Sequence, residues 1–291
     1  MVAALGLTWG GTFLVIELAL ETLTPFWIAA ARISIATLPT VLVWRVLGGK
    51  LWRTEERAWA SLVCVGALSS AVPFMLLSWG QQFVTSGFAG VSMAAVALLV
   101  LPLAHFFVPG EQLTQRKVLG FVIGFLGVVI LIGGQAFSST GVHLETPGRI
   151  ACVCAACCYA VSSVVMRRLP PIDPIGLAAV PLLFGSALII PTAFMSEGIP
   201  PMPDARTIAI LCFLGLVPTA GANFLRVWVI RTAGPVFMSL TNYQVPVWSV
   251  VLGAVFLSEP LPQSLLLALT LILAGVGLSQ FSALKRVFVR S

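Results

Sequence analysis

The sequence predicts an all-α integral membrane protein in which about ten transmembrane helices form two inverted five-helix repeats. Three features carry this prediction: the composition, a series of long apolar stretches and an internal similarity. Of the 291 residues, 59% are hydrophobic and 9% are charged, and the mean hydropathy is +1.05. A water-soluble domain carries about 25% charged residues, and so few charges cannot cover the surface of a folded chain of this size. We therefore expect lipid to be the solvent.

Ten apolar stretches are long enough to cross a bilayer, because a spanning helix needs about 20 mostly apolar residues. Clusters of Gly, Pro and charged residues separate them, as in Gly48-Gly49-Lys50. A membrane β-barrel would instead show alternating segments of about ten residues. The expected helices cover residues 2–20, 25–47, 59–83, 87–108, 116–134, 148–169, 173–195, 206–230, 234–257 and 264–282.

The distribution of basic residues predicts the orientation, since cytoplasmic loops retain Lys and Arg. With the N-terminus inside, the outer loops hold only Arg149 and Arg206. The first stretch lacks a basic leader and a small-residue cleavage site, so we expect it to remain as a spanning helix. We expect a multi-pass protein of the bacterial inner membrane with both termini in the cytoplasm. The inner loops and tail hold Arg45, Lys50, Arg53, Arg57, Arg116, Lys117, Arg167, Arg168, Arg231, Lys285, Arg286 and Arg290.

The two halves of the chain resemble each other at an offset of 148 residues. The segment 108–113 before the fifth helix matches the segment 256–261 before the tenth, and Gln115 and Gly127 match Gln263 and Gly275. Because each half has five helices, the second half enters the membrane from the opposite side, which is an architecture of transporters. We expect the first repeat at residues 1–140 and the second at 141–291.

Several local motifs resemble those of the drug/metabolite transporter superfamily, whose members have two EamA-type repeats. The resemblance covers essentially the whole chain and, within the superfamily, is closest in overall impression to bacterial amino-acid exporters of the YddG type. It implies export of small amphipathic metabolites, typically amino acids, from a central cavity shared by the two halves. The first half departs from the usual repeat, with Leu98 where the family has a proline. The motifs are Trp9-Gly10-Gly11-Thr12-Phe13, Arg32, Gly110-Glu111-Gln112-Leu113, and Pro246 thirteen residues before Glu259.

Polar and aromatic residues inside the expected spans are candidates for contacting a substrate, because lipid-facing positions exclude polar groups. Asn242 and Tyr243 are expected near the middle of the ninth helix. Alignment of the two repeats places Tyr159 opposite Trp9, which would put one aromatic ring on each side of a site at the middle of the membrane. Helix–helix packing is the alternative for all of these residues. The remaining substrate candidates are Phe13, Ser78, Trp79, Gln82, Ser163 and Asn223.

Two charged residues, Glu17 and Arg32, lie inside expected helices and need partners. They can form a structural ion pair with each other, or Arg32 can bind a substrate carboxylate. Glu17 is the only plausible intramembrane acid for proton coupling. Glu111 and Glu259, next to helix starts, are expected to cap helices.

Prolines inside the expected spans predict bends, either as simple kinks or as pivots around a cavity. They are Pro39, Pro73, Pro102, Pro181, Pro191, Pro218 and Pro246.

Motifs for catalysis are missing, and we expect no enzyme, no cofactor and no metal. There is no G-x-x-x-x-G-K-[ST] and no H-E-x-x-H, and the cysteines between residues 152 and 158 lack a second pair of ligands from another segment. The net charge of +6 is distributed over loops and does not predict nucleic-acid binding.

We expect a secondary transporter that exports neutral and aromatic amino acids by alternating access. The alternatives are an exporter of cationic drugs or other toxic metabolites and, more distantly, a multispanning membrane enzyme.

Overall fold

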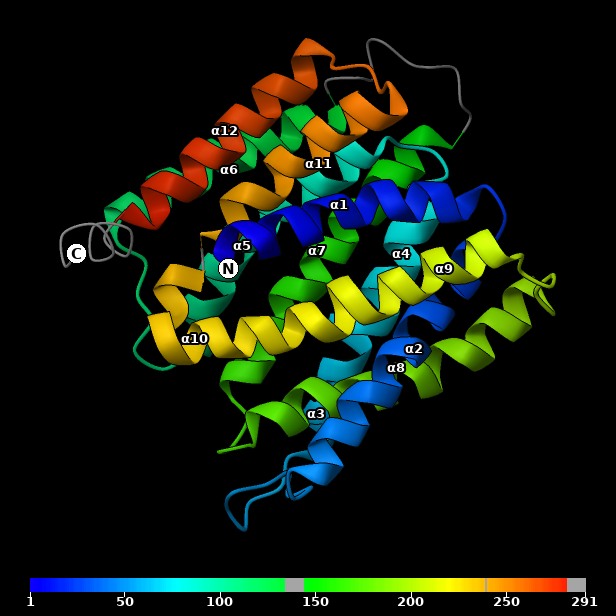
Figure 1. Ribbon diagram of the computed structural model, residues 1–291. Coiled ribbons are helices and arrows are strands. Elements are labelled where there is room, and N and C mark those ends of the chain that lie inside the picture. Colours follow the sequence, from blue (N-terminus) through cyan, green and yellow to red (C-terminus); the bar gives the residue numbers. More distant parts are fainter. Residues whose placement is uncertain (134–143, 239, 282–291) are drawn as a thin grey trace.

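The computed structural model describes residues 1–133, 144–238 and 240–281, and its regular elements are helices (Figure 1). Eight segments are long and apolar enough to cross a membrane, and two further apolar helices of 17 residues bring the spans to ten within the described residues. The expected boundary between the repeats, near residue 140, lies outside these residues. The helices are α1 (Val2–Leu20), α2 (Pro25–Val46), α3 (Trp59–Gly66), η1 (Ala67–Ala71), α4 (Val72–Gly80), α5 (Ser86–Phe107), α6 (Gln115–Gly133), α7 (Glu145–Arg167), α8 (Pro174–Glu197), α9 (Ala205–Leu214), η2 (Gly215–Gly221), α10 (Ala222–Met238), α11 (Thr241–Leu257) and α12 (Gln263–Ser279).

One expected boundary is wrong. We expected the eighth span to end at residue 230 and the ninth to begin at residue 234. In the structure α10 continues to Met238 and α11 begins at Thr241. Residues 242 and 243 therefore lie in the first turn of α11, and the expectation that they occupy midspan is corrected.

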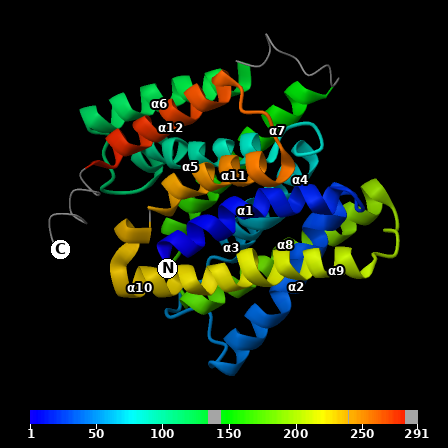
Figure 2. The ribbon, with the colours of Figure 1, turned by 45° about the horizontal axis from the view of Figure 1, so that its top comes forward.

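Glycines bring α6 and α12 into close contact, and the two helices lie side by side along one edge of the bundle (Figures 1 and 2). A Cβ atom added to Gly127 would lie 2.8 Å from Cγ1 of Ile272 and 3.0 Å from the carbonyl oxygen of Ala268. Small residues allow helix backbones to approach in this way inside a bilayer. Gly127 thus serves the packing of α6 against α12.

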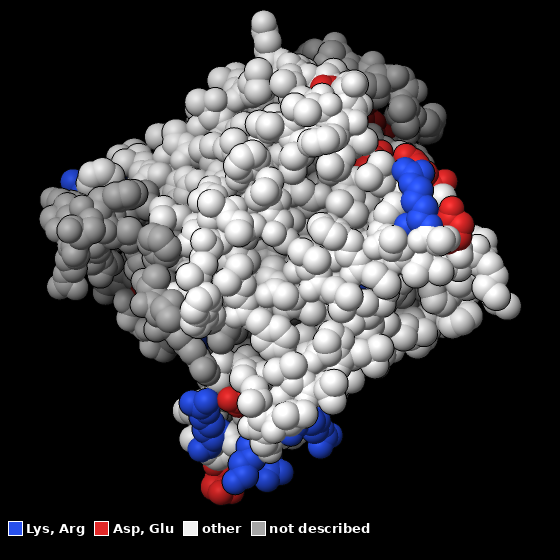
Figure 3. Space-filling view, viewed as in Figure 1, with Lys and Arg blue, Asp and Glu red and all other residues white. Residues whose placement is uncertain are grey.

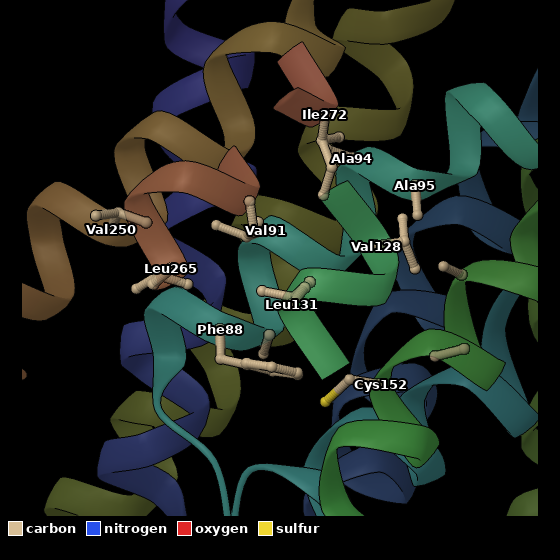
Figure 4. Packing of buried hydrophobic residues seen from close by; sticks show 14 of the residues in the cluster. Phe88, Val91, Ala94, Ala95, Val128, Leu131, Cys152, Val250, Leu265 and Ile272 are labelled. Carbon is tan, nitrogen blue, oxygen red and sulfur yellow. The ribbon is translucent and has the colours of Figure 1, made fainter. Parts of the chain in front are cut away.

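The largest cluster of buried side chains joins the two halves of the chain. It contains residues of α5, α6 and α7 together with residues of α11 and α12, and Figure 4 shows Phe88, Val91 and Leu131 of the first half near Leu265 of the second. At one end of the bundle the α2–α3 loop pairs with the α7–α8 loop, where the N–H of Arg53 donates to the carbonyl of Pro171 at 3.0 Å. The repeats are therefore interleaved and share one core.

Two spans contain a π-helical segment at corresponding positions. The third span is built of α3, η1 and α4, and the eighth of α9, η2 and α10. η1 begins at Ala67 and η2 at Gly215, 148 residues later, which is the offset of the sequence repeat. Pro218 lies inside η2, and Pro73 lies at the start of the helix that follows η1. Because π-helical turns inside α-helices are frequent at functional sites, the residues around these segments are candidates for a functional site.

Candidate functional site

Arg32 is buried in α2 and has no acidic partner among the residues that the structure describes. Only 6% of its surface is exposed. Its Nε donates a hydrogen bond of 2.8 Å to Oγ1 of Thr219 in η2, and its guanidinium carbon lies 4.0 Å from the ring centroid of Phe74 in α4. Among the ion pairs of the described residues, none involves Arg32. The cation is thus held by one hydroxyl and one aromatic face, and its charge is not neutralised.

Side-chain donors, one of them from another span, satisfy the irregular backbone of η2. In an α-helix the carbonyl of Leu214 would accept from the N–H of residue 218, but Pro218 has no N–H. Oγ1 of Thr219 donates to this carbonyl instead, at 2.8 Å. Nε1 of Trp9 donates to the carbonyl of Pro218 at 3.0 Å, and Nδ2 of Asn223 donates to that of Thr219 at 2.7 Å. η2 is therefore fixed to α1 by Trp9 and to α2 by Arg32.

Tyr159 of α7 completes this region from the other side. Its side chain packs against the buried cluster that contains Phe74 and also against the main core that contains Phe13. The region around Arg32 thus receives residues from α2, α4, α7 and η2, which belong to both halves of the chain.

The remaining polar candidates of the sequence lie in different settings. Ser163 donates its hydroxyl to the carbonyl of Tyr159 in its own helix, at 2.7 Å, and Ser78 is buried in α4. Trp79 lies edge-on against Phe83, with ring centroids 5.1 Å apart. The surroundings of all three side chains are ordinary packing for buried helices.

Gln82 is not in the interior. It is exposed in the turn after α4, whereas the preceding residue, Gln81, is 1% exposed and donates from Nε2 to the carbonyl of Phe13 at 2.9 Å. Asn242 is likewise exposed, and Tyr243 is partly buried with its hydroxyl unpartnered. The pattern of polar residues at three- and four-residue spacing did not distinguish Gln81 from Gln82, because both fit one side of the helix.

None of the ion pairs of the described residues joins Glu17 to Arg32, which was the alternative expected from the sequence. Glu17 is partly buried in α1, and its Oε2 is buried without a hydrogen-bond partner. Two neighbours of Arg32, Phe74 and Thr219, are not among the site residues predicted from the sequence. Thr219 shares a helical face with Asn223, which is a sequence signal for it, but an aromatic residue in an apolar stretch has no such signal.

The capping prediction for Glu259 is confirmed with an unexpected partner. Its Oε1 and Oε2 accept the N–H groups of Ser86 and Gly87, at 2.7 and 3.0 Å, so it caps α5 rather than the helix that follows it. Glu111 caps no helix among the described residues and pairs instead with Lys117 and Arg167 at 3.4 and 2.8 Å. Partial burial acts to raise the pKa of Glu111, but the two cations outweigh it and hold this pKa below its ordinary value.

A hollow of about 360 Å³ lies between the end of α5 and the loop that follows, lined by His105–Gln112. None of the predicted substrate residues lines it. In the described residues, therefore, the hollow is separate from the region around Arg32.

The family model for EamA-like transporters matches residues 1–133 and 146–281, which is nearly the whole chain. The chain belongs to the EamA-like transporter family. This places it among membrane transporters and not among enzymes.

Full-length relatives of this EamA-like transporter carry transporter names. The chain is 23% identical to the uncharacterized transporter YoaV of Bacillus subtilis, with 96% of this chain and 95% of the relative covered. It is 28% identical to an uncharacterized transporter of Archaeoglobus fulgidus, over 95% and 96% of the two chains. It is 26% identical to the uncharacterized inner membrane transporter YedA of Escherichia coli K12, over 94% and 88%.

A solved crystal structure shows the same fold as this EamA-like transporter. It has a TM-score of 0.66 and 21% sequence identity, and the match covers 98% of each chain.

Figure 3 shows the charged side chains gathered at separate ends of one face, with most of the surface between them free of charge. The chain is a multi-pass protein of the inner membrane.

Proposed function

We propose that this transporter exports small amphipathic metabolites that carry a carboxylate, with neutral and aromatic amino acids as its leading substrates. The observation that carries the proposal is the buried guanidinium of Arg32, which has no acidic partner among the described residues. A charge inside the membrane is costly and marks substrate or ion pathways. A substrate carboxylate supplies the missing counter-ion.

The hydrogen bonds of Arg32 leave room for such a ligand. Nε is occupied by Thr219, and this is the only hydrogen bond that the guanidinium makes within the described residues. The two terminal nitrogens remain available, and arginine binds carboxylates through parallel charge-assisted hydrogen bonds. Arg32 therefore suits the carboxylate of an amino acid.

Aromatic rings near Arg32 favour an apolar or aromatic side chain on the substrate. Phe74 stacks on the guanidinium, Tyr159 packs beside it and Trp9 holds the adjacent backbone of η2. Aromatic pairs contribute about 0.5–1.5 kcal/mol beyond their buried area. An acidic or strongly basic side chain on the substrate has no matching group among these residues.

Alternating access follows from the arrangement of the repeats, which we place at residues 1–140 and 141–291. Transporters built of inverted repeats move one part against the other around a central site. η1 and η2 interrupt the α-helical hydrogen bonding of the third and eighth spans at corresponding positions. These segments are the points at which the two spans bend when the site opens. We propose that both termini lie in the cytoplasm, a proposal supported by the Lys and Arg residues of the loops on that side.

Flux measurements test this function. Proteoliposomes containing the purified protein and loaded with one labelled amino acid at a time should release leucine, phenylalanine or tryptophan faster than empty liposomes. Loss of one charge-assisted hydrogen bond costs about 1.5–3 kcal/mol, so Arg32→Gln should weaken substrate binding by about tenfold to a hundredfold.

The matched control is Arg206→Gln, because Arg206 is exposed and pairs with Glu21 at 3.0 Å. This variant should transport as the unchanged protein does. A flat release trace for the whole amino-acid panel would contradict the proposed substrate class. Equal transport by the Arg32 and Arg206 variants would move the carboxylate site elsewhere.

A further inference from the structure

We propose that Arg226 of α10 is a second carboxylate-binding residue of this transporter, which receives the substrate at the inner entrance of its path to Arg32. The inner entrance is at the end of the bundle where α1 begins, the end that the proposed orientation places at the cytoplasm. The inference rests on the proposed function, because it names a further site for the same substrate carboxylate.

Arg226 has no acidic partner among the residues that the structure describes. All ten Asp and Glu residues of the chain lie in the described ranges, and none of the ion pairs there involves Arg226. Its side chain is exposed, whereas that of Arg32 is 6% exposed. Charged residues within membrane spans face the bundle interior or a water-filled space, and they mark substrate or ion pathways.

The exposed side chain of Arg226 lies on the side of α10 that faces the protein. Ala222 and Val229, four residues before it and three residues after it, are 4% and 2% exposed and pack in one cluster with the start of α1. Residues three and four apart share one face of a helix. Trp228 is 52% exposed and, two residues from Arg226, lies about 200° around the helix. Arg226 is therefore exposed toward the interior of the bundle and not toward the lipid that surrounds Trp228.

The face of the eighth span that carries Arg226 leads to Arg32. Thr219, which accepts the hydrogen bond from Nε of Arg32, precedes Arg226 by seven residues. Asn223 lies between them on the same face and donates from Nδ2 to the carbonyl of Thr219 at 2.7 Å. Seven residues of helix span about 10 Å. The two cations thus lie at successive depths, with Arg226 nearer to the inner end.

The corresponding position in the first half of the chain is closed. At the repeat offset of 148 residues, Arg226 corresponds to Ser78 of α4, which is 1% exposed. Val229 corresponds at the same offset to Gln81, and both are buried, at 2% and 1% exposure. The two helices therefore bury corresponding residues and differ at the position of Arg226.

Glycines close the end of the bundle near Ser78. A Cβ atom added to Gly80 of α4 would lie 2.9 Å from the carbonyl oxygen of Gly148 in α7, and one added to Gly148 would lie 3.0 Å from the carbonyl oxygen of Gly80. The residue that corresponds to Gly80 is Trp228, which is exposed. Alternating access opens one end of a path while the other is closed. The open end is therefore the one formed by α10 and the start of α1, which lie next to each other (Figures 1 and 2).

Chemical modification of the unchanged protein tests the exposure and the ligand of Arg226. Phenylglyoxal reacts with guanidinium groups that water reaches, and mass spectrometry locates the adducts. In phosphatidylcholine nanodiscs we expect adducts at Arg226 and at Arg57, which is exposed in the α2–α3 loop, and none at Arg32. Phenylalanine and 3-phenylpropionate carry a carboxylate and should slow the reaction at Arg226 but not at Arg57. Phenethylamine lacks the carboxylate and should protect neither residue.

Two results of this experiment would overturn the proposal. The first is an unmodified Arg226, or equal protection of Arg226 by phenethylamine. The second is protection of Arg226 by anionic phosphatidylglycerol in the nanodisc and not by the added carboxylates, because the ligand would then be a lipid headgroup.

Transport measured from each side of the membrane tests the role of Arg226. Inside-out membrane vesicles present the inner entrance to added substrate, and right-side-out vesicles present the opposite end. Arg226→Gln should raise the KM for uptake into inside-out vesicles about twofold to fivefold, which is the effect of an exposed ion pair. The KM in right-side-out vesicles should stay unchanged. Arg226→Lys keeps the charge and should recover most of the affinity.

The control is Arg57→Gln, which removes one positive charge from an inner loop and should leave both KM values unchanged. A KM that rises equally in both kinds of vesicle, or in neither, would contradict a binding role at the inner entrance. Protection of Arg226 by 3-phenylpropionate without transport of any amino acid would contradict the proposed function alone. Amino-acid transport with an unprotected Arg226 would contradict the present proposal alone.

Discussion

Replacing Thr219 by Val tests whether η2 depends on a single hydroxyl. The hydroxyl of Thr219 donates to the carbonyl of Leu214 at 2.8 Å and accepts from Nε of Arg32 at the same distance. Valine keeps the shape and removes both bonds. A hydrogen bond to a charged group contributes about 1.5–3 kcal/mol and a neutral one about 1 kcal/mol, although measured hydrogen bonds between membrane helices average about 0.6 kcal/mol. We expect a loss of about 2–3 kcal/mol in the free energy of unfolding.

The assay is reversible unfolding in mixed micelles, with Thr270→Val as the matched control. Oγ1 of Thr270 is exposed and donates only to the carbonyl of Leu266 in its own helix, at 2.8 Å, so its loss should stay within about 0.5 kcal/mol. Thr219→Ser keeps the hydroxyl and should recover most of the lost stability. The reasoning is refuted if the Thr219 and Thr270 valine variants have the same stability.

Three further substitutions test the packing of α6 against α12, the capping of α5 and the hydrogen bond between α1 and η2. Gly127→Val should lower the free energy of unfolding by about 1–3 kcal/mol, because a Cβ atom there meets Ile272 and Ala268. The control Gly277→Val should change stability little, since no atom of the described residues lies within 4 Å of its Cβ position. Equal melting temperatures of the two variants would contradict the close contact of α6 and α12. Glu259→Gln should lower stability by about 1–2 kcal/mol, measured by the same unfolding assay, and an unchanged value would show that the cap contributes nothing. Trp9→Phe removes the hydrogen bond to Pro218 and should slow substrate release without lowering expression; undiminished release would show that this tie is not needed.

Most of the fold could be predicted from the sequence because the lipid environment restricts which structures an apolar segment can form. Stretches of about 20 apolar residues with few charges form helices in lipid, where every backbone group must be satisfied within the segment. The start of α2 at Pro25 and its end near Gly48 follow from local signals of this kind. The expected boundary between the eighth and ninth spans failed because α10 continues past residue 230 to Met238.

The π-helical segments could not be predicted. A π-helical turn adds one residue to a helix and shifts the faces of everything that follows. In a uniformly apolar stretch such as residues 59–80, this shift changes no visible pattern. The prolines at 73 and 218 indicated bends, but only the structure shows how Thr219 replaces the N–H that Pro218 lacks.

The candidate site was predicted only in part, again because the sequence does not show which face of each helix meets its neighbours. Trp9 and Asn223 lie against η2, although their polar atoms bind the backbone there, and their contact with substrate stays a prediction. Gln82 was chosen where Gln81 is the buried residue, since adjacent residues differ by about 100° around a helix and only the neighbouring helices decide which one faces inward.

The separation of the two intramembrane charges has a functional consequence. A Glu17–Arg32 ion pair would satisfy both groups permanently, and neither would be free to bind anything. In the structure Arg32 lies against Thr219 and Phe74, and none of the ion pairs of the described residues joins it to Glu17. The terminal nitrogens of Arg32 therefore stay available for a carboxylate from outside the protein, and neutralising Arg32 should lower the affinity for substrate.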